Sequence, residues 1–135
     1  MIRAMHGLPP YAEHLGIRVD GEEAGMPRLA CDFGDQVLGR PGFWHGGALS
    51  GLLEMAAVTA LLKSLGDEEA GNVRFKPVNA TVDFMRGGGD RTAFASGRAL
   101  RVGRTVATIE AFAWQDGPDR PIAMITAHYL LKRPA

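Results

Sequence analysis

The chain has 135 residues, 46% of them hydrophobic and 22% charged, and its 15 basic side chains equal its 15 acidic ones. This balance gives no electrostatic reason to expect nucleic acid or an anionic membrane as a partner. The length suits one domain over residues 1–135, and the single cysteine, Cys31, excludes an internal disulfide and fits a reducing, cytoplasmic location.

The first third of the chain predicts short elements separated by turns. Residues 1–17 hold no apolar run long enough for a signal peptide, and YAEHLG predicts one or two helical turns ending at Gly16. The segment 17–33 predicts two short strands around a Gly21–Gly25 turn, because apolar side chains alternate with polar ones. Glycine and proline interrupt residues 34–44, which we expect to form a loop.

A long helix is predicted from about Gly46 to Leu65, stopped by Gly66. The acidic segment DEEAGN that follows is expected to be a loop. The longest apolar stretch, Ala48 to Leu62, is shorter than the ~20 residues of a membrane span, so we expect no membrane insertion.

Four strands are predicted in the second half of the chain, in PVNATVDFMR, RTAFASGRALRV, RTVATIEAFAW and PIAMITAHYLL. The first alternates cleanly, with Val78, Ala80, Val82 and Phe84 on one face. Short turns at GGGD, Gly103 and QDGPDR join consecutive strands, and this spacing predicts an antiparallel meander.

The elements together predict an α+β fold with one long central helix and about six antiparallel strands. A helix of ~20 residues is about 30 Å long, and this one is apolar around nearly all of its circumference, so protein should cover most of its sides. One sheet covers only part of such a helix. We therefore expect a second copy to cover the rest in a homodimer, with a dimer of dimers left open.

Glu54 interrupts the apolar helix. Seventeen residues separate His45 from Lys63, and Glu54 is the only charged one among them. Removing an unpaired carboxylate from water is costly, so a buried one is usually paired, shifted in pKa or used in chemistry. From the residues alone, an ion-paired structural carboxylate and a catalytic one both remain open.

The run GFWHGGALSGLLEMAAVTALL resembles the phenylacetate-pathway (PaaI-like) branch of hotdog acyl-CoA thioesterases. In that branch a His-Gly-Gly opens the helix and an acidic residue lies nine positions after the histidine, as His45, Gly46, Gly47 and Glu54 do here. The segments HLGIRV, GRALRVGRTVATIEAFAW and AMITAHYLL extend the resemblance over most of the chain. It implies the hotdog fold, in which a curved sheet encloses the helix, and hydrolysis of an acyl-CoA thioester.

The resemblance also implies roles for three residues. The Gly46 N–H would polarise the thioester carbonyl, Glu54 would act as general base or nucleophile, and His45 would orient the loop or contact the substrate. An apolar setting should raise the pKa of Glu54. Gly46 and Glu54 are eight residues apart, about 12 Å along one helix, so a shared site requires Glu54 to face the Gly46 of a second copy.

Five further residues are candidates for substrate contact, and each also has a simpler explanation. Phe43 and Trp44 are expected to pack at the pocket rim, and Gly47 eases the turn into the helix. The Thr59 hydroxyl is expected to satisfy a helix carbonyl, and the Arg104 side chain to be solvated.

One departure from the family pattern bears on substrate placement. Many relatives carry an amide side chain about six residues before the histidine, where this chain has Gly39, and the nearest amide is Gln36. Two alternatives to hydrolysis stay open: a hotdog hydratase or dehydratase acting on enoyl or hydroxyacyl thioesters, and a binding module that holds acyl-CoA without turnover. The His-Gly-Gly with an acid at plus nine favours hydrolysis.

No metal and no resident cofactor are expected, since coenzyme A is part of the substrate. The four histidines, His6, His14, His45 and His128, lack metal-ligand spacing. The sequence has no GxSxG motif and no Cys–His pair around Cys31, so serine and cysteine nucleophiles are not expected.

Overall fold

A computed structural model describes residues 9–134. Their elements in chain order are α1 (Pro10–Leu15), β1 (Ile17–Glu23), β2 (Met26–Cys31), the 3₁₀ turn η2 (Asp35–Val37), α2 (Gly46–Leu65), α3 (Asp67–Asn72), β3 (Arg74–Phe84), β4 (Ala93–Val102), β5 (Val106–Trp114) and β6 (Pro121–Lys132).

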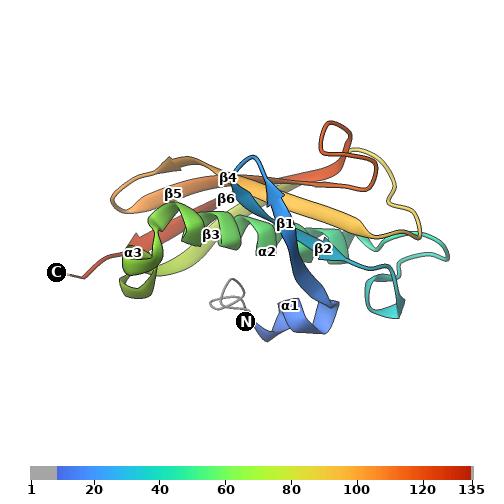
Figure 1. The fold of residues 1–135 in the computed structure, drawn as a ribbon, viewed down its shortest axis with the longest axis horizontal. Helices are drawn as coiled ribbons and strands as arrows, with labels where there is room; N and C mark the ends of the chain where they lie inside the picture. Colours follow the sequence, from blue (N-terminus) through green and yellow to red (C-terminus); the bar gives the residue numbers. More distant parts are fainter. Residues whose placement is uncertain (1–8, 135) are drawn as a thin grey trace.

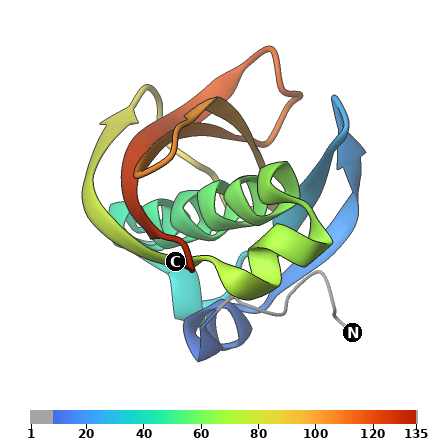
Figure 2. The same cartoon turned by 90° about the vertical axis from the view of Figure 1, so that its left-hand side faces the viewer.

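The six strands form one antiparallel sheet that curls around α2 (Figures 1 and 2). The strand order is β1-β2-β4-β5-β6-β3, so β1 and β3 are the two edges. The predicted α+β architecture and the antiparallel pairing are confirmed. The predicted meander is wrong at β3, which does not pair with the next strand in sequence but crosses to the far edge and pairs with β6.

Helix α2 is the centre of the core, and its predicted bounds are confirmed. It begins at a side-chain cap from His45 and ends at Gly66, whose φ of 82° favours glycine. Gly97 of β4 allows a close approach, because a Cβ there would lie 3.0 Å from the Ala56 carbonyl oxygen. By length and hydropathy α2 would also suit a bilayer, but 72% of that apolar window is buried inside the protein, as expected of a core helix.

The helix that follows α2 corrects a prediction. The acidic segment expected to be a loop forms α3, which turns the chain from α2 into β3. An ion pair between Glu69 of α3 and Arg133, far along the chain, ties this helix to the end of β6. That contact is long-range, so no local pattern predicts it.

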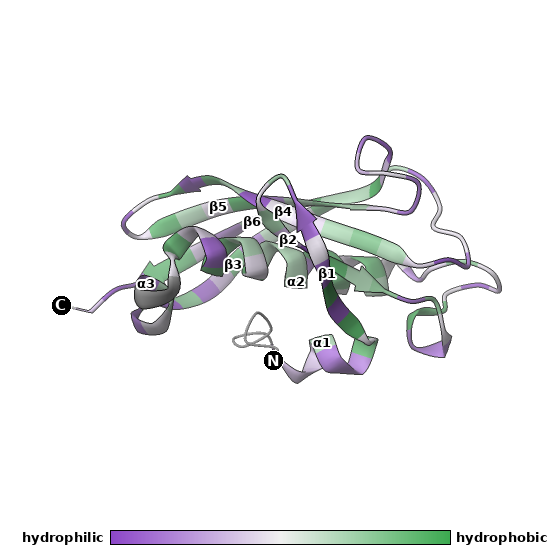
Figure 3. Cartoon of the chain, in the orientation of Figure 1, coloured by the Kyte–Doolittle hydropathy of each residue, from purple (hydrophilic) through white to green (hydrophobic). Residues whose placement is uncertain are grey.

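Edge strand β3 lies at one rim of the sheet, where it pairs with β6 and nothing in the described chain covers its other side (Figure 2). Ala80 and Phe84 are opposite the buried Ala127 and Ala123 of β6, so they share the inner face of the sheet. Nevertheless Ala80 is exposed, and Phe84 is 56% exposed. Hydrophobic colour extends along the strands above α2, while α1 and the β5–β6 loop are mostly hydrophilic (Figure 3).

Candidate active site

The first turn of α2 carries a free backbone donor. His45 caps the helix, since its Nδ1 accepts a hydrogen bond from the Gly47 N–H at 2.8 Å. This acceptor role places the ring proton on Nε2. The Gly46 N–H has no acceptor within residues 9–134. Gly46 is therefore available to an electronegative atom at the positive end of the helix dipole, whereas the Gly47 donor is already used.

We expect His45→Ala to lower the free energy of unfolding by about 1 kcal/mol, because it removes the cap of α2. His45→Asn is the matched control, since its side-chain oxygen can accept the same Gly47 N–H. Urea denaturation of the three proteins measures the difference. An alanine variant as stable as the wild type would contradict the capping role.

Glu54 lies on an exposed stripe of an otherwise covered helix. Gly47, Ser50 and Glu54 follow one another at helical spacing and are exposed or half-buried, while their neighbours Leu53 and Met55 are buried. The Glu54 carboxylate makes no ion pair or hydrogen bond with any of the described residues. The structural alternative of a carboxylate paired with an arginine therefore does not describe this subunit.

Ser50 lies between the two groups of interest. Its Oγ donates to the Gly46 carbonyl at 2.9 Å, within the same stripe. Gly46 and Glu54 themselves are eight residues apart, about 12 Å along the helix axis. A single thioester carbonyl cannot contact both of them within one subunit.

One aromatic ring, that of Phe84, lies against Gly46, and two more aromatic residues precede the helix in sequence. A Cβ on Gly46 would lie 3.3 Å from Cζ of Phe84, so glycine allows this ring to rest against the start of α2. Phe43 is exposed, two residues before the cap. Trp44 is buried, and its Nε1 donates to the Arg91 carbonyl at 3.0 Å. Phe43 thus lies at the surface and Trp44 packs below it, and their contact with substrate stays a prediction.

Gly39 has a steric reason to be glycine. A Cβ at this position would lie 2.9 Å from the His45 Cα, a backbone atom that cannot move without shifting the helix start. The Gly39 N–H donates to the Phe43 carbonyl at 2.9 Å, which closes the loop. Gln36 does not replace the missing amide, because its Nε2 donates to the backbone carbonyls of Leu15 and Asp32, both at 3.2 Å.

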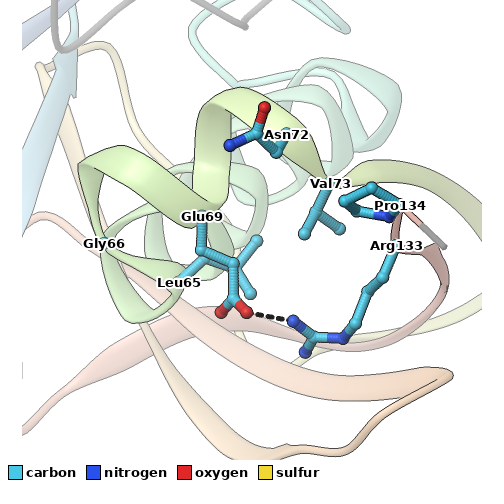
Figure 4. Close-up of a pocket in the computed structure, with 7 residues that line it drawn as sticks. All are labelled: Leu65, Gly66, Glu69, Asn72, Val73, Arg133 and Pro134. Atoms are coloured by element: carbon cyan, nitrogen blue, oxygen red, sulfur yellow. Dashed lines mark hydrogen bonds and ion pairs between the residues drawn. The ribbon is translucent and has the colours of Figure 1, made fainter.

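A pocket of about 650 Å³ lies at the opposite end of α2 from His45 (Figure 4). Figure 4 shows Glu69 and Arg133 paired within it, and Arg133 also donates to the carbonyls of Gly103 and Arg104. Arg133 is thus held by the protein itself. The pocket is lined by Leu65, Gly66, Glu69, Asn72, Val73, Arg133 and Pro134.

The Arg104 side chain makes no hydrogen bond or ion pair within residues 9–134, and its contact with coenzyme A stays a prediction.

Two buried polar groups have structural partners. Thr59 Oγ1 donates to the Met55 carbonyl at 2.8 Å, which is the simpler of its two predicted roles. Cys31 Sγ lies 3.1 Å from the Leu15 carbonyl, and burial raises the pKa of this thiol to about 11. The thiol therefore stays protonated near neutral pH and is a poor nucleophile.

Metal binding gains no support from the described part of the chain. Within it, no three His, Cys, Asp or Glu side chains are grouped to hold an ion, and His6 lies outside it. The expectation of no metal stays a prediction.

Tyr129 is a candidate residue that the sequence analysis did not identify. It lies on β6, is 1% exposed, and its hydroxyl has no hydrogen-bond partner among residues 9–134. The signal was present in the alternation of Ala127, Tyr129 and Leu131, which predicts an inward tyrosine whose hydroxyl needs a partner.

Comparison with known proteins identifies the fold and the family. The sequence profile described as the acyl-CoA thioesterase N-terminal domain matches residues 38–130, which include His45, Gly46 and Glu54. The chain belongs to this family. As a hotdog thioesterase domain, it carries α2 and the strands β3 to β6 almost entirely within the matched region, while β1 and β2 precede that region. No protein of the curated set is similar enough to count as a match.

Solved structures share the hotdog fold of this thioesterase domain. The phenylacetic acid degradation-related protein of Ralstonia eutropha is 23% identical, with a TM-score of 0.75, over 91% of this chain and 90% of its own. A Haemophilus influenzae thioesterase has a TM-score of 0.77 at 12% identity, over 91% of this chain and 82% of its own. A Staphylococcus aureus thioesterase has a TM-score of 0.75 at 17% identity, over 93% and 100%. At these sequence identities the similarity to the solved structures establishes a shared fold and no shared activity.

Proposed function

We propose that the protein hydrolyses acyl-CoA thioesters to a carboxylic acid and free coenzyme A in a site shared by two copies of the chain. One observation carries the proposal: the exposed stripe of α2 holds a carboxylate, Glu54, and at its start a backbone donor, Gly46, and neither has a partner in the part of the chain that the structure describes. Membership of the acyl-CoA thioesterase family supports the choice of substrate class.

In the proposed reaction the thioester carbonyl oxygen accepts a hydrogen bond from the Gly46 N–H of one copy. Glu54 of the other copy removes a proton from water, whose oxygen bonds to the carbonyl carbon. The C–S bond then breaks, and coenzyme A leaves as a thiolate that takes the proton from Glu54. Direct attack by Glu54, through an anhydride that water then hydrolyses, is a second route compatible with the same arrangement.

The edge strand β3 supports the proposed dimer. An uncovered strand of eleven residues with an apolar inner face normally pairs or is protected. If the β3 strands of two copies lie side by side, their α2 helices approach in opposite directions, and the start of one helix can reach the middle of the other.

We expect Val78→Asp to weaken the dimer by at least about 3 kcal/mol, roughly a hundredfold in dissociation constant, because an unpaired carboxylate would be buried between the copies. Val78 is 55% exposed in the subunit, so the fold should tolerate the change. Val106→Asp is the matched control, since Val106 is 43% exposed on β5, away from β3. Analytical ultracentrifugation measures the dissociation constant. A wild type that is monomeric at micromolar concentration would contradict the shared site.

Thiol release from a panel of aromatic, short-chain and medium-chain acyl-CoAs tests the function. We expect hydrolysis of at least one class by the wild type. An enoyl-CoA that loses its ultraviolet absorbance without releasing thiol would support the hydratase alternative. Tight acyl-CoA binding by calorimetry with no thiol released would support the binding module.

A further inference from the structure

Trp44, two residues before α2 begins, is bonded to the loop 85–92 that joins β3 to β4. Its backbone N–H donates to the Gly88 carbonyl at 3.0 Å, and its Nε1 donates to the Arg91 carbonyl at 3.0 Å. The adjacent Phe43 forms a β-bridge with the same loop. In Figure 1 this loop and the chain before α2 lie at the same end of the molecule. The position of the helix start therefore depends on where loop 85–92 lies.

Loop 85–92 does not determine its own position. It contains neither helix nor strand, and residues 87–89 are three consecutive glycines, which give the backbone little preference for one conformation. The Met85 and Arg86 N–H groups donate to the Ile122 carbonyl at 2.8 and 3.2 Å, which fixes only the start of the loop. Contacts from another element must hold the rest.

Gln115, the residue that follows β5, makes these contacts. Its Oε1 accepts a hydrogen bond from the Gly89 N–H at 3.0 Å, and its Nε2 donates to the Gly89 carbonyl at 3.0 Å and to the Arg91 carbonyl at 2.9 Å. The side-chain amide thus satisfies both backbone groups of Gly89, as a neighbouring strand would. The Arg91 carbonyl accepts from both Gln115 and Trp44, so one oxygen atom joins the two side chains.

An ion pair joins the same two segments but contributes less. Arg91 and Asp116 lie 2.7 Å apart, with side chains 56% and 58% exposed. Exposed ion pairs add little stability, because water and salt screen them. The Gln115 amide is half-buried and makes three hydrogen bonds. It is therefore the main link between the end of β5 and loop 85–92.

We propose that Gln115 is a positioning residue of the active site, which fixes the direction of the Gly46 N–H. It acts through loop 85–92 and Trp44, and not on the substrate itself. This inference rests on the proposed function. A backbone donor stabilises the transition state only if it points at the place where the carbonyl oxygen becomes negative, and a displacement of about 1 Å can cost about 10²-fold in rate.

Gln115→Leu tests the role by removing all three hydrogen bonds. We expect kcat for thiol release to fall about 10- to 100-fold with KM nearly unchanged, because the Gly46 N–H acts mainly on the charge of the transition state. Gln115→Glu keeps the acceptor for Gly89 and loses both donors, so its kcat should fall as well. Thr92→Val is the matched control: its hydroxyl donates to Asp32 at 2.7 Å, outside this path, so kcat should not change.

A double-mutant cycle with Gly46→Pro separates positioning from a general loss of structure. The proline variant has no N–H to position, so adding Gln115→Leu to it should lower kcat by less than about twofold. An equal fall in both backgrounds would mean that Gln115 acts elsewhere, and would overturn the inference. A Gln115→Leu variant with the wild-type kcat would overturn it too, while hydrolysis would stand.

Hydrogen exchange measured by NMR tests the contact without catalysis. In Gln115→Leu the two N–H groups of Trp44 should exchange at least about tenfold faster, relative to the N–H of Ile109, which is 0% exposed in β5. Trp44→Phe assigns the indole signal. No acceleration at Trp44, or the same acceleration at Ile109, would overturn the inference. If the wild type releases no thiol from any acyl-CoA, the proposed function fails, and this measurement alone decides whether Gln115 holds the start of α2.

Discussion

Replacing Glu54 by glutamine should lower kcat for acyl-CoA hydrolysis by about 10²- to 10⁴-fold, the range typical of a positioned general base. Glutamine keeps the size of the side chain and removes its ability to accept a proton from water. The carboxylate makes no ion pair in the described chain, so the free energy of unfolding should change by less than about 0.5 kcal/mol. The loss would then report on chemistry and not on folding.

Thiol release under saturating acyl-CoA measures this effect, with urea denaturation as the check on folding. Glu13→Gln is the matched control, because Glu13 is an exposed acid on α1 outside the proposed site. Equal rates for the wild type and the Glu54 variant would remove Glu54 from the mechanism.

Replacing Gly46 by proline should lower kcat by about 10²- to 10³-fold relative to Gly46→Ala, because proline lacks the N–H that polarises the carbonyl. The position allows this test. Gly46 is the first helical residue, where proline is well tolerated, and the preceding His45 has the extended backbone, φ −71° and ψ 135°, that precedes proline. The Gly46 N–H makes no bond within residues 9–134, so its removal breaks nothing in the subunit.

Gly46→Ala is the matched control, since alanine adds the same Cβ against the Phe84 ring and keeps the donor. Far-UV circular dichroism and thermal melting should show that α2 forms in both variants. Proline and alanine variants of equal activity would exclude the Gly46 N–H from the reaction.

Local patterns were enough to predict the central helix but not the complete sheet. An apolar run that starts after a capping histidine and ends at Gly66 specifies α2 within the chain itself. The position of β3 depends instead on pairing with β6, whose paired residues lie 39 to 58 positions later in the chain, and hairpin rules concern only neighbouring strands. Similarly, the Glu69–Arg133 pair that ties α3 to the end of β6 is invisible to any short window.

The candidate site likewise has features that the sequence predicts and features that depend on tertiary structure. His45, Gly46 and Glu54 lie on one helix, so their spacing could be recognised from the sequence. The burial of Tyr129 arises only when β6 packs under α2, and the tight loop that forces glycine at position 39 depends on backbone contacts with His45. These features come from tertiary structure, which neither periodicity nor motif spacing describes.

Mixed dimers test the central claim most directly. A Gly46→Pro chain supplies an intact Glu54, and a Glu54→Gln chain supplies an intact Gly46 N–H, so a dimer of one of each contains one complete site if the site is shared. Unfolding the two inactive variants together and refolding them should restore roughly a quarter of the wild-type activity per chain, from random assortment of subunits with two sites per dimer. Recovery to this level is the predicted result, with the Glu54→Gln variant refolded alone as the inactive reference. A mixture no more active than its two components would contradict a site built from both copies.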